Sequence, residues 1–174
     1  FIVEKAFYDL ETYSEDIKII DPGCGCGIFL VSTIDYLSKE FDVSPIDIIN
    51  NNVYGIDIVK DNVIRTRYVL ECYLLSKNII TDNVIFKNII AEDSLSNNWC
   101  DLFSVDSFDY VVGNPPYLNT HEMSRDKINF LKENFVTTKQ GSFNLFYAFI
   151  EQALNNIRET GLVAYIIPNN YLTI

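Results

Sequence analysis

Short apolar runs and longer amphipathic stretches alternate along the chain. The short runs have the length and β-branched character of buried strands, and the longer stretches carry apolar residues at helical spacing. Five ranges are predicted as strands: 17–21, 53–57, 84–91, 109–113 and 162–167. The predicted helices are 27–41, a short one from Ser44-Pro45 to about residue 50, 59–76, 125–135 and 142–157. This order predicts an α/β fold with a doubly wound, mainly parallel sheet.

The length of 174 residues is typical of one domain with a full core. The sequence starts at Phe1 without a methionine and stops at Ile174 just after an apolar run, so we expect a partial domain whose sheet is truncated after the fifth strand. No stretch reaches the roughly 18 apolar residues of a membrane span, and the start does not resemble a signal peptide. We therefore expect a cytoplasmic protein with no membrane partner.

Charge is unevenly divided along the chain. Residues 1–117 hold 8 basic and 19 acidic side chains, which accounts for the whole net charge of −11, whereas residues 118–174 hold five of each. Because phosphate contacts come from clustered Lys and Arg, any strong grip on DNA must come from outside this chain. The cysteines are irregularly spaced and form one Cys-x-Cys pair without a second ligand pair, so we expect reduced thiols and no metal site.

The stretch DYVVGNPPY, residues 109–117, places Asn114, Pro115, Pro116 and Tyr117 directly after a predicted buried strand. The two prolines stiffen the backbone and contribute no N–H, which leaves a rigid cluster of hydrogen-bond acceptors. Such a cluster suits a planar amino group: the Asn114 side-chain oxygen and the Pro115 carbonyl would each take one N–H, and Tyr117 would stack on the ring or amide plane. The ordinary alternative is a turn that only ends the strand.

The loop DPGCGCG, residues 21–27, joins the first predicted strand to its helix. Its glycines allow a tight turn and close approach of a ligand at the carboxyl edge of the sheet. It lacks the third glycine of the dinucleotide fingerprint and the Gly-Lys-Ser/Thr of a phosphate-binding loop. Asp21 at its start fits a ligand with an ammonium group better than a pyrophosphate, although it could simply pair with a loop N–H.

Two further acids follow predicted strands. Asp57 is placed to accept hydrogen bonds from ribose hydroxyls, or to cap the helix after it, or both. Asp93 could accept an adenine amino group while the Ser94 N–H meets a ring nitrogen, or it could be an ordinary turn residue. Together with the glycine loop, these acids outline a site for a nucleoside that carries an amino-acid tail. S-adenosylmethionine fits that description.

With these features in this order, the chain resembles the class I S-adenosylmethionine-dependent methyltransferases, and more closely the gamma-group DNA adenine-N6 methyltransferases of restriction–modification systems. The matching stretches are DPGCGCGIFL (21–30), YGID (54–57), AED (91–93), NPPY (114–117), SFNLFYAFIEQAL (142–154) and GLVAYIIPNNYL (161–172). The resemblance implies a Rossmann-like fold and a target adenine received by residues 114–117. The residues expected around the cofactor are Asp21, Gly23, Gly25, Gly27, Phe29, Asp57, Ile58, Asp93, Ser94 and Asn114.

The chain departs from the family pattern in two respects. Cys26 stands where the family has a small or polar residue, and no N-terminal cofactor-flanking motif is recognisable in residues 1–16. The family's remaining strands, second base-stacking aromatic and target-recognition domain would lie beyond Ile174. Phe146 lies in a stretch that the family places near the cofactor, but helix packing explains Phe29 and Phe146 equally well.

The resemblance implies one catalytic domain over residues 1–174 that methylates a flipped adenine, with double-stranded DNA held by a recognition domain outside this chain. The isolated piece is expected to be inactive. Two alternatives stay open, because the turn selects the geometry of an amine rather than adenine itself. One is methylation of a protein glutamine or an RNA base, and the other is a cofactor-binding module without catalysis.

Overall fold

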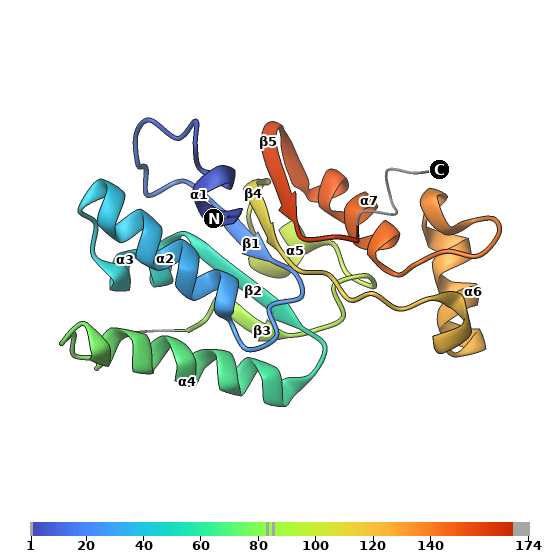
Figure 1. Cartoon of the computed structure of the whole chain (residues 1–174), viewed down its shortest axis with the longest axis horizontal. Coiled ribbons are helices and arrows are strands. Elements are labelled where there is room, and N and C mark those ends of the chain that lie inside the picture. The colour runs from blue at the N-terminus through green and yellow to red at the C-terminus, as the bar shows by residue number, and fades with distance from the viewer. Residues whose placement is uncertain (1, 83, 85, 169–174) are drawn as a thin grey trace.

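In the computed structural model, residues 2–82, 84 and 86–168 are described. Their strands form one five-stranded sheet in the order β3-β2-β1-β4-β5, and every neighbouring pair is parallel (Figure 1). This confirms the predicted parallel sheet. The strands are β1 (Ile19–Asp21), β2 (Val53–Asp57), β3 (Ile89–Ala91), β4 (Phe108–Gly113) and β5 (Ile157–Tyr165).

Helices cover both faces of the sheet, as expected for a doubly wound fold (Figure 1). The first core cluster packs one face under α1 (Ile2–Ala6), α2 (Ile28–Phe41), α3 (Pro45–Asn51) and α4 (Lys60–Ser76). The opposite face packs against α5 (Trp99–Phe103) and α7 (Phe146–Asn156), and α6 (Arg125–Asn134) packs beside α7. Two short 3₁₀ turns, η1 (Thr120–Glu122) and η2 (Val136–Thr138), flank α6.

The chain reverses its direction of travel across the sheet at β1. Ile19 pairs with Val53 of β2 on one side and with Tyr110 of β4 on the other. In an open parallel sheet such a reversal opens a crevice at the carboxyl ends of the strands. The loops after β1, β2 and β4 therefore meet at one edge.

Several predicted boundaries are wrong. The third strand is limited to β3, because Lys87 and Asn88 form a turn in which the Asn88 side chain donates to the Asn50 carbonyl at 3.1 Å. The fifth strand starts earlier than expected, at Ile157, with a register shift between Phe108 and Tyr110. The short helix α5 was not predicted. Of the family-like stretch 161–172, residues 169–172 lie outside the described residues.

The segment between β4 and α7 leaves the sheet and returns to its starting point. Its base is closed by a bridge between Asn119 and Asn144 and by a hydrogen bond from the Leu145 N–H to the Leu118 carbonyl, 2.8 Å long. This pairing explains why α7 starts at Phe146 rather than at the predicted Ser142. We call residues 118–145, which include α6, the excursion.

None of the helices in the described residues combines the length and apolar character that crossing a membrane requires. Within the same residues, no group of three or more His, Cys, Asp or Glu side chains is arranged to hold a metal ion.

The N-terminal segment is fixed to the sheet by one buried amide. Asn52 is fully buried, and its side chain donates to the carbonyls of Ser14, Glu15 and Ile17 and accepts the Tyr13 hydroxyl at 2.6 Å. Removing it leaves the buried Ile17 carbonyl and the part-buried partners of the amide without these hydrogen bonds.

We predict that Asn52→Ala lowers the free energy of unfolding by about 2–4 kcal/mol, measured by chemical denaturation. The neighbouring Asn51, whose side chain is exposed, serves as control, and Asn51→Ala should change it by less than about 0.5 kcal/mol. Equal effects of the two substitutions would show that the buried amide has no special role.

Candidate functional site

A cavity of about 500 Å³ lies at the carboxyl edge of the sheet. It brings together seven of the residues predicted for the site: Gly23, Asp57, Ile58, Asp93, Ser94, Asn114 and Pro116. Asp57 is the last residue of β2, and the others come from the loops after β1, β2, β3 and β4. Asp57, Asp93, Asn114 and Pro116 therefore share one cavity, as the sequence predicts.

The remaining predicted residues do not line this cavity: Asp21, Gly25, Gly27, Phe29, Pro115 and Tyr117. Phe29 instead packs against the first core cluster. Phe146 is buried against Tyr117, and it is Phe149, one turn further along α7, that reaches the cavity. An ideal Cβ on Gly23 would lie 3.9 Å from Phe149 and 4.0 Å from Pro116, so the glycine loop, α7 and the turn meet closely here.

Asp21 lies beneath the glycine loop with only 1% of its surface exposed. Its Oδ1 accepts the Gly23 N–H at 3.1 Å, while its Oδ2 has no hydrogen-bond partner among the described residues. Burial raises the pKa of Asp21 to about 7, against the opposing effect of the Gly23 N–H and with a further increase from Asp57. A Cβ on Gly113 would come within 2.6 Å of Oδ1, so a side chain at residue 113 would displace this carboxyl group.

Asp57 lines the cavity but is not the N-cap of α4, because that helix begins at Lys60 with Val59 as its N-cap residue. Its Oδ1 accepts the Val59 N–H at 2.8 Å, at the start of α4, and the Asn62 side chain at 3.1 Å. Its Oδ2 accepts the Gly25 N–H at 2.9 Å. One carboxylate thus fixes the glycine loop relative to the start of α4.

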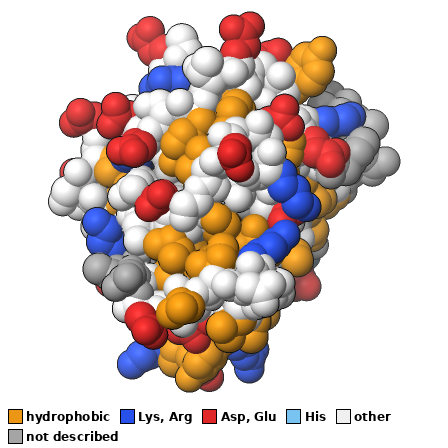
Figure 2. All heavy atoms as spheres, turned by 90° about the vertical axis from the view of Figure 1, so that its left-hand side faces the viewer, with side chains coloured by type: hydrophobic (Ala, Val, Ile, Leu, Met, Phe, Trp, Pro, Cys, Tyr) orange, Lys and Arg blue, Asp and Glu red, His pale blue; other side chains and the backbone are white. Residues whose placement is uncertain are grey.

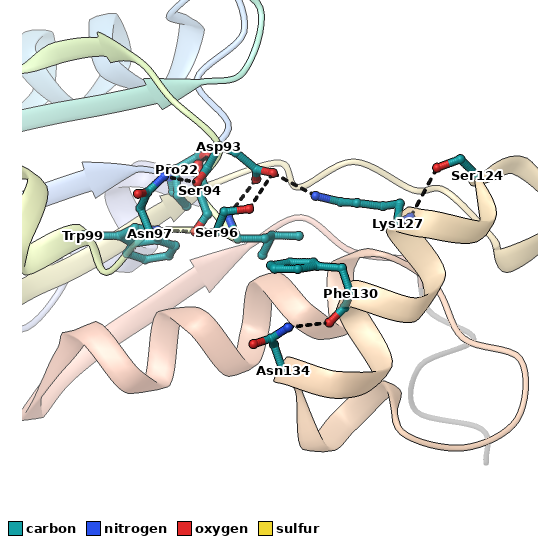
Figure 3. Close-up of polar contacts among 11 residues, drawn as sticks. Pro22, Asp93, Ser94, Ser96, Asn97, Trp99, Ser124, Lys127, Phe130 and Asn134 are labelled. Atoms are coloured by element: carbon teal, nitrogen blue, oxygen red, sulfur yellow. Dashed lines mark hydrogen bonds and ion pairs between the residues drawn. The ribbon is translucent and has the colours of Figure 1, made fainter.

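Asp93 is held by contacts from its own turn and from the excursion (Figure 3). Its Oδ1 accepts the Leu95 N–H, and its Oδ2 accepts both the Ser96 hydroxyl and the Lys127 ammonium, each at 2.9 Å. Burial acts to raise the pKa of Asp93, but these contacts, led by Lys127, outweigh it and hold the pKa below its usual value. Asp93 is therefore an anion fixed by a lysine that no sequence motif singled out.

Ser94 is buried, and its environment fixes the backbone at this end of the cavity. Its hydroxyl donates to the Pro22 carbonyl in the glycine loop, and its own carbonyl accepts the Trp99 indole N–H at 2.8 Å (Figure 3). No sequence pattern predicts this role for Trp99. It also did not identify several cavity-lining residues: Pro22, Leu95, Leu118, Glu122, Met123, Ser124, Lys127, Leu145 and Phe149.

The Asn-Pro-Pro-Tyr turn follows β4 with Asn114 and Pro116 exposed and Pro115 buried. Tyr117 is 39% exposed, and its ring meets Phe146 edge to face with centroids 6.3 Å apart. Its hydroxyl contacts Asn114 Oδ1 and the Ile166 carbonyl, the latter at 2.6 Å. Tyr117 also lines a second hollow of about 320 Å³, so the turn lies between two cavities.

A sequence-family profile described as Eco57I restriction-modification methylase matches residues 51–174. The chain is 25% identical over 159 residues to the type II methyltransferase M.BanIII of Aneurinibacillus aneurinilyticus, covering 91% of this chain and 26% of that protein. It is 33% identical over 75 residues to the type II methyltransferase M.TthHB8I of Thermus thermophilus, covering 40% of this chain and 18% of that protein. The chain thus spans about a quarter of the length of the first relative and less of the second.

Solved structures of related fold confirm the predicted Rossmann-like class I architecture. The DrdV–DNA complex superposes with a TM-score of 0.78 at 18% identity and covers 100% of this chain and 20% of that chain. A class I S-adenosylmethionine-dependent methyltransferase from Listeria monocytogenes, described as putative, gives a TM-score of 0.64 at 19% identity, covering 98% of this chain and 44% of that chain. At these identities the similarity establishes the fold alone.

We predict that Lys127→Met loosens α6. The ion pair with Asp93 joins side chains that are each only 28% exposed, so its loss should cost about 1 kcal/mol of local stability. Hydrogen exchange of the α6 amides should accelerate about fivefold. Lys132→Met on the same helix is the control, because Lys132 is exposed and makes no ion pair within the described residues. Unchanged exchange in the Lys127 variant would contradict the prediction.

Proposed function

This chain belongs to the Eco57I restriction-modification methylase family, and from that premise we propose that it carries the catalytic centre of a DNA adenine-N6 methyltransferase that uses S-adenosylmethionine. The observation that carries the proposal is the shared cavity, which Asp57, Asp93, Asn114 and Pro116 line. The described residues would form one catalytic domain. The protein would act in the cytoplasm, where its proposed DNA substrate lies.

The residues around the cavity fit S-adenosylmethionine. Asp57 offers acceptor sites for ribose hydroxyls, and Asp93 and Ser94 offer polar groups for the adenine ring. Ile58, Leu95 and Phe149 supply the apolar walls that a purine requires. When bound, the cofactor supplies a methyl group on a positively charged sulfur.

Asp21 would favour this cation from beneath the glycine loop. Its Oδ2 is buried without a partner, and a charge in such a poorly solvated place acts strongly on a neighbouring opposite charge. Direct contact with the ammonium group, as the sequence suggested, would require the loop to open, because Asp21 does not line the cavity.

The turn would hold the amine that receives the methyl group. Asn114 and the Pro115 carbonyl accept its two N–H groups, and these become stronger donors as the nitrogen gains positive charge. The two acceptors therefore stabilise the transition state more than the ground state, which is how such a site accelerates a reaction. No general base is needed before transfer, because the proton can leave to water afterwards.

DNA would be held mainly by parts of the protein outside this chain. On the face at the left of Figure 1, Figure 2 shows acidic side chains scattered among apolar areas and no continuous basic patch among the described residues there. Residues 118–174 are neutral as a group. The turn geometry alone would also admit a glutamine amide or an RNA base, and family membership is what favours DNA.

We predict that Asn114→Ala in the full-length gene product lowers the rate of methyl transfer about 10²–10³-fold, because one preorganised acceptor is lost. The dissociation constant of S-adenosylmethionine should change less than threefold. Sequencing that detects N6-methyladenine in host DNA, with calorimetry for the cofactor, measures both. Asn134→Ala, exposed on α6, is the control. Undiminished N6-methyladenine in the Asn114 variant would overturn the assignment.

The buried carboxyl group of Asp21 should make the stability of the protein depend on pH. Because the folded state raises the pKa of Asp21 to about 7, the contribution of Asp21 to wild-type stability falls as pH rises from about 4 to about 7 and stays constant above that. Asp21→Asn removes this penalty, so above pH 7 the variant without cofactor should be about 2–4 kcal/mol more stable than wild type. Denaturation curves between pH 4 and 8 measure the difference.

The same carboxylate should make cofactor binding pH-dependent. Below pH 7, protonation of Asp21 should weaken the binding of the cationic cofactor by up to about tenfold per pH unit in the wild type. The Asp21→Asn variant should bind weakly at every pH, and the exposed Asp16→Asn variant should follow the wild type. Identical binding curves for wild type and Asp21→Asn would refute the electrostatic role.

A further inference from the structure

The Tyr117 hydroxyl faces two acceptors at once. It contacts Asn114 Oδ1 and the Ile166 carbonyl, the latter at 2.6 Å. A phenol has a single proton, so it cannot donate to both oxygens. In one of the two contacts, the Tyr117 oxygen must therefore act as the acceptor and its partner must supply the hydrogen.

Of these three groups, the Ile166 carbonyl is held in place by the backbone. The Ile166 N–H donates to the Gly113 carbonyl at 3.0 Å, directly after the pairing of Gly113 with Tyr165 that ends β4 and β5. The Asn114 amide can reorient, because a half-turn about its last side-chain torsion exchanges Oδ1 and Nδ2 and leaves the shape of the side chain almost unchanged. After that half-turn, the Asn114 amino group donates to Tyr117, and Tyr117 donates to Ile166.

We propose that the Tyr117 hydroxyl is a positioning group that fixes the Asn114 amide with its amino group toward Tyr117 and its oxygen toward the cavity. This deepens the function proposed above and rests on it. In that orientation Asn114 presents an acceptor to the amine of the target base. The opposite orientation would present its own N–H groups to another donor, which is repulsive.

This role is separable from stacking, because it belongs to the hydroxyl and stacking belongs to the ring. Tyr117→Phe keeps the ring and removes only the hydroxyl. The amide is then free to populate both orientations, so part of the molecules would present the wrong group. The exposure of Tyr117 makes the substitution compatible with folding.

The test uses the full-length gene product and DNA duplexes with either adenine or purine at the target base. Purine lacks the amino group, so the ratio of the two dissociation constants isolates recognition of the amine without requiring catalysis. We expect Tyr117→Phe to lower the preference for adenine about fivefold and kcat about tenfold. The dissociation constant of S-adenosylmethionine should stay within twofold. Tyr68→Phe, exposed on α4, is the control.

A double variant distinguishes loss of amide orientation from an indirect effect of Tyr117→Phe. Asn114→Asp has two equivalent oxygens and no orientation to set, so adding Tyr117→Phe to it should change the adenine preference less than twofold. An unchanged preference in the single Tyr117 variant, or additive effects in the double variant, would overturn the inference alone. Failure of the wild type to methylate adenine in DNA would instead overturn the proposed function, and the inference with it.

Discussion

The site depends on β1 lying between β2 and β4. Since all three strands run in the same direction, their carboxyl ends reach one edge, and the register of Ile20 with Tyr54 and Val111 fixes their relative heights. Neighbouring strands lie about 4.8 Å apart, so the loops after β2 and β4 start about 10 Å from each other with the glycine loop between them. The hydrogen bonds of the sheet thereby set the dimensions of the cavity.

The sequence predicts those elements of this arrangement whose ends are set by neighbouring residues in the chain. The strand β2 matches its apolar run, and β4 differs by one residue, because both are bounded by residues that end a strand. Asp57 ends β2 and the Asn-Pro-Pro turn follows β4, so the sheet itself carries Asp57, Asn114 and Pro116 to the cavity. The third strand was predicted too long because the apolar run continues through a turn that depends on a contact with Asn50.

The rest of the site is set by tertiary packing. Lys127 and Phe149 lie on helices whose apolar spacing predicts that they form but not which turn faces the cavity. The choice of Phe149 over Phe146 follows from where α7 starts, and that start is fixed by the bridge between Asn119 and Asn144. A pairing between residues 25 positions apart leaves no periodic pattern for the sequence to display.

The closed base of the excursion also has an evolutionary consequence. Because Leu118 and Leu145 are hydrogen-bonded to each other, the chain leaves and rejoins the sheet layer at the same place, whatever lies between them. Insertions or deletions at its tip would leave the Asn-Pro-Pro turn and α7 undisturbed. The excursion can therefore vary in length at its tip, whereas Glu122, Met123, Ser124 and Lys127 line the cavity and keep its first part coupled to the candidate site.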